Sequence, residues 1–125
     1  MVPRVAVYPT VELTRGAAFF DTITVTDPDT GAAVDLTGLT IKWQFRAGRT
    51  SSGTLLADLG ITASTLLTVT AATGLIEPFV AGSLTTAWPV SVWHDARVID
   101  AGQGNRVLYW WRGEVVPVDG VTPPP

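Results

Sequence analysis

The chain has 125 residues, a net charge of −3 and no cysteine, and charged residues make up only 15% of it. The lack of cysteine excludes a disulfide scaffold, a thiolate zinc site and a cysteine nucleophile. The seven arginines and single lysine form no run or stripe along the chain, so we expect no nucleic-acid partner. No apolar stretch approaches the roughly 20 residues of a membrane span, and the first residues lack the apolar core of a signal peptide.

Helical periodicity is nearly absent. Thr- and Val-rich segments alternate with Gly and Pro, which predicts short β-strands joined by turns. The first strand is predicted over 19–26, followed by a turn and a short piece over 33–39. The clearest alternation of apolar and polar residues covers 40–46, and 54–57 is predicted to pair back on that strand as a hairpin. The apolar face of the 40–46 strand carries Ile41, Trp43 and Phe45.

The middle of the chain contains shorter signals. Residues 65–69 and 74–77 predict two more short strands, whereas the pattern over 83–87 is ambiguous and is compatible with one helical turn. The next strand is predicted over 88–95, entered through a proline that favours a strand start or an edge position. One face of this strand is expected to carry Val90 and Val92.

The last strand is predicted over 106–116, after a long loop over 96–105, with Gly113 marking a bulge. Both of its faces carry large side chains, which predicts a central strand that is covered on both sides. Trp110 and Trp111 are adjacent on this strand and therefore point to opposite faces. Because both cannot enter one core, one of them must contact a second layer, a loop or a partner.

About seven short strands in a chain of this length predict an all-β fold, an immunoglobulin-like antiparallel sandwich of two sheets. A small β-barrel is the alternative. We expect one sandwich domain over 15–118, an extended N-terminal arm over 1–14 and a Pro-rich tail over 119–125. The two ends have little local structure of their own, which makes them candidate contact arms.

The sequence offers few residues for chemistry. The only histidine, His94, precedes Asp95 directly, so the two side chains should point to opposite sides of a strand, with His94 at the strand end and Asp95 in a turn. The pair Asp27 and Asp29 has the spacing of an ordinary turn and lacks the rest of a calcium-binding loop. We therefore expect no catalytic residue, no metal site and no cofactor, and we expect the chain not to be an enzyme.

The surface composition points to binding. The low charge content indicates either a surface covered by neighbouring molecules or one covered by Thr, Ser and Gly. Trp43 is expected in the core, and exposed tryptophans elsewhere would form a contact surface. The candidate interface residues are Trp110, Trp111, Trp88, Trp93, Val121, Pro123, Pro124 and Pro125.

Several short motifs also occur in a recognisable order. Arg15-Gly16 precedes a Thr- and Phe-rich strand, Val-Asp-Leu-Thr-Gly occupies 34–38, and the closing strand contains Arg-Gly-Glu-Val-Val at 112–116. In this order of motifs, over about 15–121, the chain resembles small phage and prophage virion proteins with an immunoglobulin-like fold. It is similar to the immunoglobulin-like N-terminal domain of phage baseplate upper proteins.

The resemblance implies a structural component of a phage virion without enzymatic activity, made in the host cytoplasm and incorporated into the particle. It implies an assembly or adaptor role at the tail, the baseplate or a fibre attachment point, with other virion structural proteins as partners in multiple copies. Decoration of the capsid surface is an alternative location. A carbohydrate-binding module that takes a host glycan is an alternative of another class, favoured by the five tryptophans.

Overall fold

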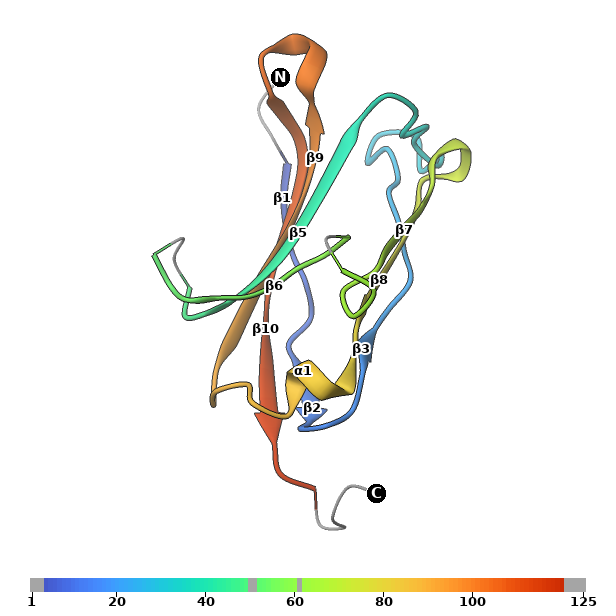
Figure 1. Cartoon of the computed structure of the whole chain (residues 1–125). Coiled ribbons are helices and arrows are strands. Elements are labelled where there is room, and N and C mark those ends of the chain that lie inside the picture. Colours follow the sequence, from blue (N-terminus) through green and yellow to red (C-terminus); the bar gives the residue numbers. More distant parts are fainter. Residues whose placement is uncertain (1–3, 50–51, 61, 121–125) are drawn as a thin grey trace.

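A computed structural model describes the backbone of residues 4–49, 52–60 and 62–120, and the side chains of these ranges from Tyr8 onward. Within these residues the chain forms ten strands in two sheets that pack face to face (Figure 1). The prediction of an all-β sandwich is confirmed, and the sheets do not close into a barrel. In the part of the chain that the structure describes, no helix is long and apolar enough to cross a membrane.

The larger sheet has the order β1–β10–β9–β5–β6, and β2 pairs with β10 beyond the end of β1. Its strands are β1 (Arg4–Val7), β2 (Val11–Thr14), β5 (Thr40–Ala47), β6 (Leu55–Asp58), β9 (Val92–Asp100) and β10 (Arg106–Val118). β1 and β2 run parallel to β10, whereas the pairs β10–β9, β9–β5 and β5–β6 are antiparallel. The predicted hairpin between 40–46 and 54–57 is confirmed by the pairing of β5 with β6.

The smaller sheet is built around β8 (Leu75–Val80). β3 (Phe19–Phe20) and β4 (Ile23–Thr24) both pair with β8 in antiparallel fashion, and β7 (Leu67–Thr70) pairs with it as well. In the larger sheet β10, β9 and β5 are adjacent. The two sheets together have the strand order of immunoglobulin-like sandwiches. The short 3-10 turn η1 (Ala71–Thr73) joins β7 to β8, and α1 (Gly82–Thr85) resolves the ambiguous pattern over 83–87 as one helical turn.

The predicted strand over 19–26 is divided into two, which is one reason why the strand count exceeds seven. β3 and β4 keep the same register along β8, so residue 21 falls opposite Pro78. A proline has no N–H to donate, so the ladder is interrupted at that point. The backbone N–H of Asp21 still donates to the Pro78 carbonyl at 3.4 Å, and the Asp21 carboxylate accepts a hydrogen bond of 2.7 Å from the backbone N–H of Thr22.

The expected N-terminal arm is wrong for the residues that the structure describes. β1 and β2 extend the larger sheet by pairing along β10, and Tyr8 between them is buried in the core. β1 and β2 pair with the edge of β10, so this segment is ordered by contacts within its own chain. The interface residues predicted in the tail, Val121, Pro123, Pro124 and Pro125, lie outside the described residues.

The hairpin of β9 and β10 also differs from the prediction (Figure 1). β9 continues through Asp100, so the expected loop over 96–105 shrinks to the 3-10 turn η2 (Ala101–Gln103) and its flanks. Asp100 caps that turn by accepting from the backbone N–H of Gly102 at 3.1 Å. The bulge in β10 lies between Val107 and Tyr109, not at Gly113.

An aromatic cluster fills the space between the sheets, where many immunoglobulin domains place a disulfide. The ring of His94 stacks on that of Phe45 at 5.0 Å between centroids, and Phe19 meets Phe45 edge-on at 5.1 Å. Trp43 is fully buried, as predicted. Trp88 is buried too and packs against Phe45 at 5.2 Å, which corrects its assignment to an interface.

The Arg15-Gly16 motif fastens the end of β2 to two other parts of the chain. Arg15 donates to the Trp88 carbonyl at 2.9 Å and forms an ion pair with Asp119 at 3.0 Å. The backbone N–H of Gly16 donates to the buried Thr85 hydroxyl at 3.1 Å. These contacts tie β2, α1 and the end of β10 together at one end of the sandwich.

Candidate binding site

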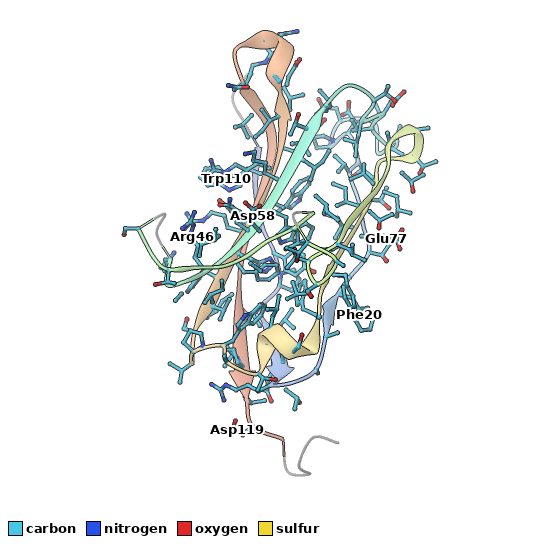
Figure 2. All side chains as sticks on the ribbon, in the orientation of Figure 1. Phe20, Arg46, Asp58, Glu77, Trp110 and Asp119 are labelled. Carbon is cyan, nitrogen blue, oxygen red and sulfur yellow. The ribbon has the colours of Figure 1, made fainter. Side chains whose placement is uncertain are left out.

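The outward surface of the larger sheet carries a shallow hollow of about 370 Å³ over β5, β9 and β10. Figure 2 shows Trp110, Arg46 and Asp58 on this side of the molecule, with Phe20 and Glu77 on the opposite side. We call this surface the Trp–Arg face. It is defined by Lys42, Arg46, Arg49, Trp93, Asp95, Arg97, Trp110 and Arg112.

The face follows from the alternation of side chains along each strand. Trp43 and Phe45 of β5 point into the core, which turns Lys42 and Arg46 outward. The same alternation in β9 and β10 adds Asp95, Arg97, Arg112 and two indole rings, and Arg49 comes from the loop after β5. Five of the eight cationic residues in the chain therefore lie around one hollow, although they are spread over 42–112 in the sequence.

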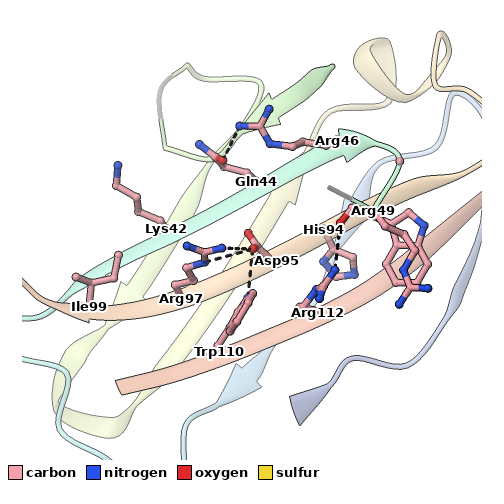
Figure 3. Close-up of a pocket in the computed structure, with 12 residues that line it drawn as sticks. Lys42, Gln44, Arg46, Arg49, His94, Asp95, Arg97, Ile99, Trp110 and Arg112 are labelled. Carbon is pink, nitrogen blue, oxygen red and sulfur yellow. Dashed lines mark hydrogen bonds and ion pairs between the residues drawn. The ribbon is translucent and has the colours of Figure 1, made fainter. Parts of the chain in front are cut away.

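Trp110 lies at the centre of this arrangement. The Arg97 guanidinium lies 4.7 Å from the centroid of its ring and the Arg112 guanidinium 5.6 Å, and Figure 3 shows the indole between the two. The indole Nε1–H donates to the Asp95 carboxylate at 3.2 Å. Two cation–π contacts and one hydrogen bond hold the ring in a single orientation.

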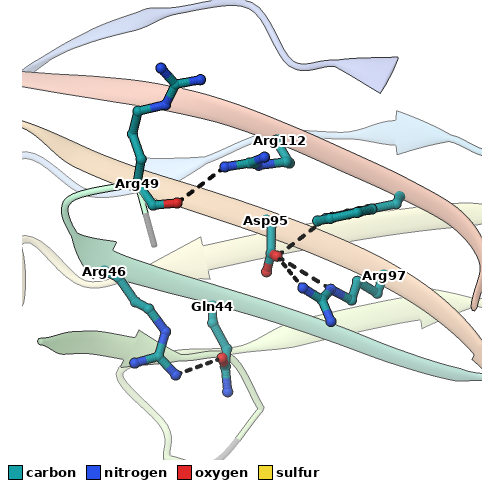
Figure 4. A network of polar contacts seen from close by, with 7 residues as sticks. Gln44, Arg46, Arg49, Asp95, Arg97 and Arg112 are labelled. Carbon is teal, nitrogen blue, oxygen red and sulfur yellow. Dashed lines mark hydrogen bonds and ion pairs between the residues drawn. The ribbon is translucent and has the colours of Figure 1, made fainter. Parts of the chain in front are cut away.

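Asp95 is the only carboxylate among the residues that define the face. Its Oδ2 accepts from Nε and Nη2 of Arg97 at 3.3 and 3.0 Å (Figure 4). The other arginines donate to neutral oxygens: Arg46 to the Gly53 carbonyl at 3.0 Å, and Arg112 to the Arg49 carbonyl at 3.1 Å. Asp58 borders the face and accepts from the amide of Gln44 at 3.2 Å.

Trp93 forms a second, smaller unit beside the first. The Arg49 guanidinium lies over its ring at 4.7 Å from the centroid. The Arg112 side chain donates to the backbone of the same Arg49, which links the loop after β5 to the two strands below it. The predicted interface residues Trp93 and Trp110 are therefore brought together on one surface.

The prediction that Trp110 and Trp111 point to opposite faces is confirmed. Trp111 turns inward, stacks with Tyr109 at 6.2 Å between centroids and packs against the core. The structure thus places Trp111 away from the hollow, and Trp110 is the member of the pair that remains on the outer surface.

His94 belongs to the core, not to a strand end as predicted. It lies within β9, and its Nδ1 accepts a hydrogen bond of 3.0 Å from Nε1 of the buried Trp43. Burial lowers the pKa of the His94 imidazole to about 4. Asp95 projects from the other face of the strand, as expected, so the two side chains cannot act on one substrate.

Asp27 and Asp29 lie in a turn, as predicted. The Asp27 carboxylate accepts from the backbone N–H of Asp29 at 2.8 Å and from that of Thr30 at 3.4 Å. The backbone N–H of Gly31 donates to the Asp27 carbonyl at 2.7 Å, and Gly31 has a φ of 72°. These contacts are the side-chain and backbone bonds of turn chemistry.

The basic character of the Trp–Arg face is not visible as a run of cations along the sequence. The sheet gathers these cations from three strands and a loop. Part of this basic character is visible in the sequence, because Lys42, Gln44 and Arg46 alternate along one predicted strand. The pairing of the strands, which decides which cations become neighbours, is not visible in the sequence.

No protein-family model matches the chain, and no match to it was found among curated proteins. The geometry of the Trp–Arg face is therefore the main basis for assigning a function.

Proposed function

We propose that the chain is a non-enzymatic assembly module of a phage virion that binds a neighbouring structural protein through its Trp–Arg face. The observation that carries the proposal is this face itself. It presents two tryptophans and five cations, and only one of those cations pairs with a carboxylate of the face. Trp and Arg are the residue types most enriched among energetically dominant contacts at protein interfaces.

The face is also organised before any partner arrives. Trp110 is held by Arg97, Arg112 and Asp95, and Trp93 is held by Arg49. Ordering long side chains on binding costs about 0.5–1.5 kcal/mol for each of them. A face whose side chains already contact one another loses less entropy on association, which favours a protein–protein contact.

The virion setting comes from the resemblance. Two of the motifs that carry it make defined contacts in this fold: Arg15-Gly16 joins β2 to α1, and 34–38 forms a turn in which Asp35 accepts from Thr37. Tail, baseplate and fibre attachment remain the proposed positions. Capsid decoration is the alternative location for the same module.

The glycan-binding alternative fits the Trp–Arg face less well. Sugar-binding modules stack pyranose rings on free indole faces, whereas guanidinium groups already lie over the rings of Trp110 and Trp93. A sugar would have to displace these arginines before it could stack. A protein partner can contact these arginines in the positions that they already occupy.

Mass spectrometry of purified particles tests the virion assignment. We expect the chain to remain with particles through a density gradient and a high-salt wash, at a fixed copy number from one preparation to the next. Detection only in the lysate of infected cells, with none in washed particles, would overturn the proposal.

A further inference from the structure

We infer that the Trp–Arg face takes an acidic peptide segment, a stretch of a neighbouring virion protein rich in Asp and Glu. The inference rests on the proposed function and adds the chemistry of the partner. It follows from the imbalance of charge on the face, from the hydrogen-bonding groups still available there and from the shape of the hollow.

The imbalance of charge is local. The chain as a whole carries −3, yet the face brings together five cations against Asp95, with Asp58 and Glu114 at its border. Glu114 lies opposite Trp93 on β10, and its carboxylate accepts a hydrogen bond of 2.6 Å from the Ser91 hydroxyl. Among the described residues Lys42 has no hydrogen bond or ion pair, and Arg46, Arg49 and Arg112 have no carboxylate partner. Carboxylates of a partner would supply the missing counter-charges, and such charge-assisted hydrogen bonds are roughly twice as strong as neutral ones.

The arginines also keep donors for a ligand. A guanidinium has five N–H groups in a planar fork that matches a carboxylate. Arg112 uses one nitrogen on the Arg49 carbonyl, and its planar group stays beside the Trp110 ring. The Arg49 guanidinium lies over the Trp93 ring at 4.7 Å from its centroid, and its N–H groups can still donate to a carboxylate. These two arginines come from a loop and from β10, so they can bind successive carboxylates of an extended peptide that crosses the strands.

A nucleic acid suits the face less well than an acidic peptide. Binding of a single strand uses bases stacked on free aromatic rings and a cationic track along the backbone. Here guanidinium groups occupy the positions over both indoles, and the cations surround one hollow of about 370 Å³. Asp95 at the centre would also repel phosphates, whereas in a peptide complex a neutral residue between two acidic ones can lie over it.

The test uses the full chain and a labelled synthetic peptide of about twelve residues, made of Asp, Glu and Gly. A peptide of the same length with Asn and Gln in place of the acids is the matched control ligand. Fluorescence anisotropy should show binding of the acidic peptide in low salt, weakening as salt is raised, and no binding of the neutral peptide.

Variants locate the binding on the face. The double variant Arg49→Gln, Arg112→Gln should weaken binding roughly tenfold or more, in line with the loss of two charge-assisted contacts. Arg106→Gln removes an exposed cation outside the face and should leave affinity unchanged. Asp95→Asn keeps an acceptor for Trp110 and removes the repelling charge, so it should strengthen binding severalfold. Circular dichroism confirms that each variant is folded.

Three results would overturn the inference. The first is no preference for the acidic over the neutral peptide. The second is equal weakening by Arg106→Gln and by the double variant. The third is tighter binding of a single-stranded oligonucleotide than of the acidic peptide. If the chain is found in particles but does not bind the acidic peptide, only the inference fails. If the chain binds the peptide but is absent from particles, the virion proposal fails instead.

Discussion

Replacing Gly113 with alanine is expected to lower the free energy of unfolding by about 3 kcal/mol, the upper part of the range for overpacked cores. Gly113 is buried on β10 opposite His94. A Cβ there would lie 2.7 Å from the Cβ of Tyr8, 2.9 Å from the Tyr8 carbonyl oxygen and 3.0 Å from Nε2 of His94. The backbone of Tyr8 cannot withdraw easily, because its N–H donates to the Arg112 carbonyl at 2.6 Å.

Chemical denaturation of Gly113→Ala measures this loss, and Gly102→Ala is the matched control. Gly102 lies exposed in η2, and a Cβ added to it would meet nothing closer than 3.5 Å, so its substitution should change stability by less than about 0.5 kcal/mol. If the two variants had the same stability, the close contact between Tyr8 and β10 would not exist in solution. Gly113, which was predicted to mark a bulge, would then not be required by this close contact.

Acidification should destabilise the fold through His94. The folded-state pKa of His94 is lowered from 6.5 to about 4 by burial, so the unfolded chain binds this proton more readily than the folded chain does. The contribution of His94 to the free energy of unfolding is therefore fully present above pH 6.5, and it is lost as the pH falls toward 4. Since one pKa unit corresponds to about 1.4 kcal/mol, the loss attributable to His94 is about 3 kcal/mol.

The variant His94→Gln isolates this contribution. Glutamine does not titrate, and its side-chain oxygen can still accept the hydrogen bond of Trp43. The variant will be less stable at pH 7 because it loses the stacking on Phe45. Its stability should nevertheless fall less steeply than that of the parent between pH 6.5 and 4, as followed by urea denaturation at each pH. Parallel pH profiles for the two proteins would show that His94 is not buried in its neutral form.

Local alternation was enough to predict much of the sandwich. The sequence between 40 and 46 alternates apolar and polar side chains, and β5 places Trp43 and Phe45 inside and Lys42 and Arg46 outside, as that pattern predicts. The adjacent tryptophans of β10 likewise point to opposite faces. Such statements need only the twofold period of a strand.

Features that depend on partners across a sheet were not predictable in the same way. The break after Phe20 comes from Pro78 on a strand more than fifty residues away. The burial of Trp88 depends on its contact with Phe45, and the order of the N-terminal segment depends on the edge of β10. The basic character of the Trp–Arg face depends on which strands are neighbours, and no single stretch of the chain encodes it.

The most direct test of the central claim is the number of copies of the chain in each particle when the Trp–Arg face is altered. We expect quantitative mass spectrometry of purified particles to show at least a tenfold loss for a folded Arg49→Gln, Arg112→Gln variant. Copies carrying Arg106→Gln should be incorporated at the level of the unaltered chain. Full incorporation of the double variant would contradict the claim that this face joins the chain to its neighbour.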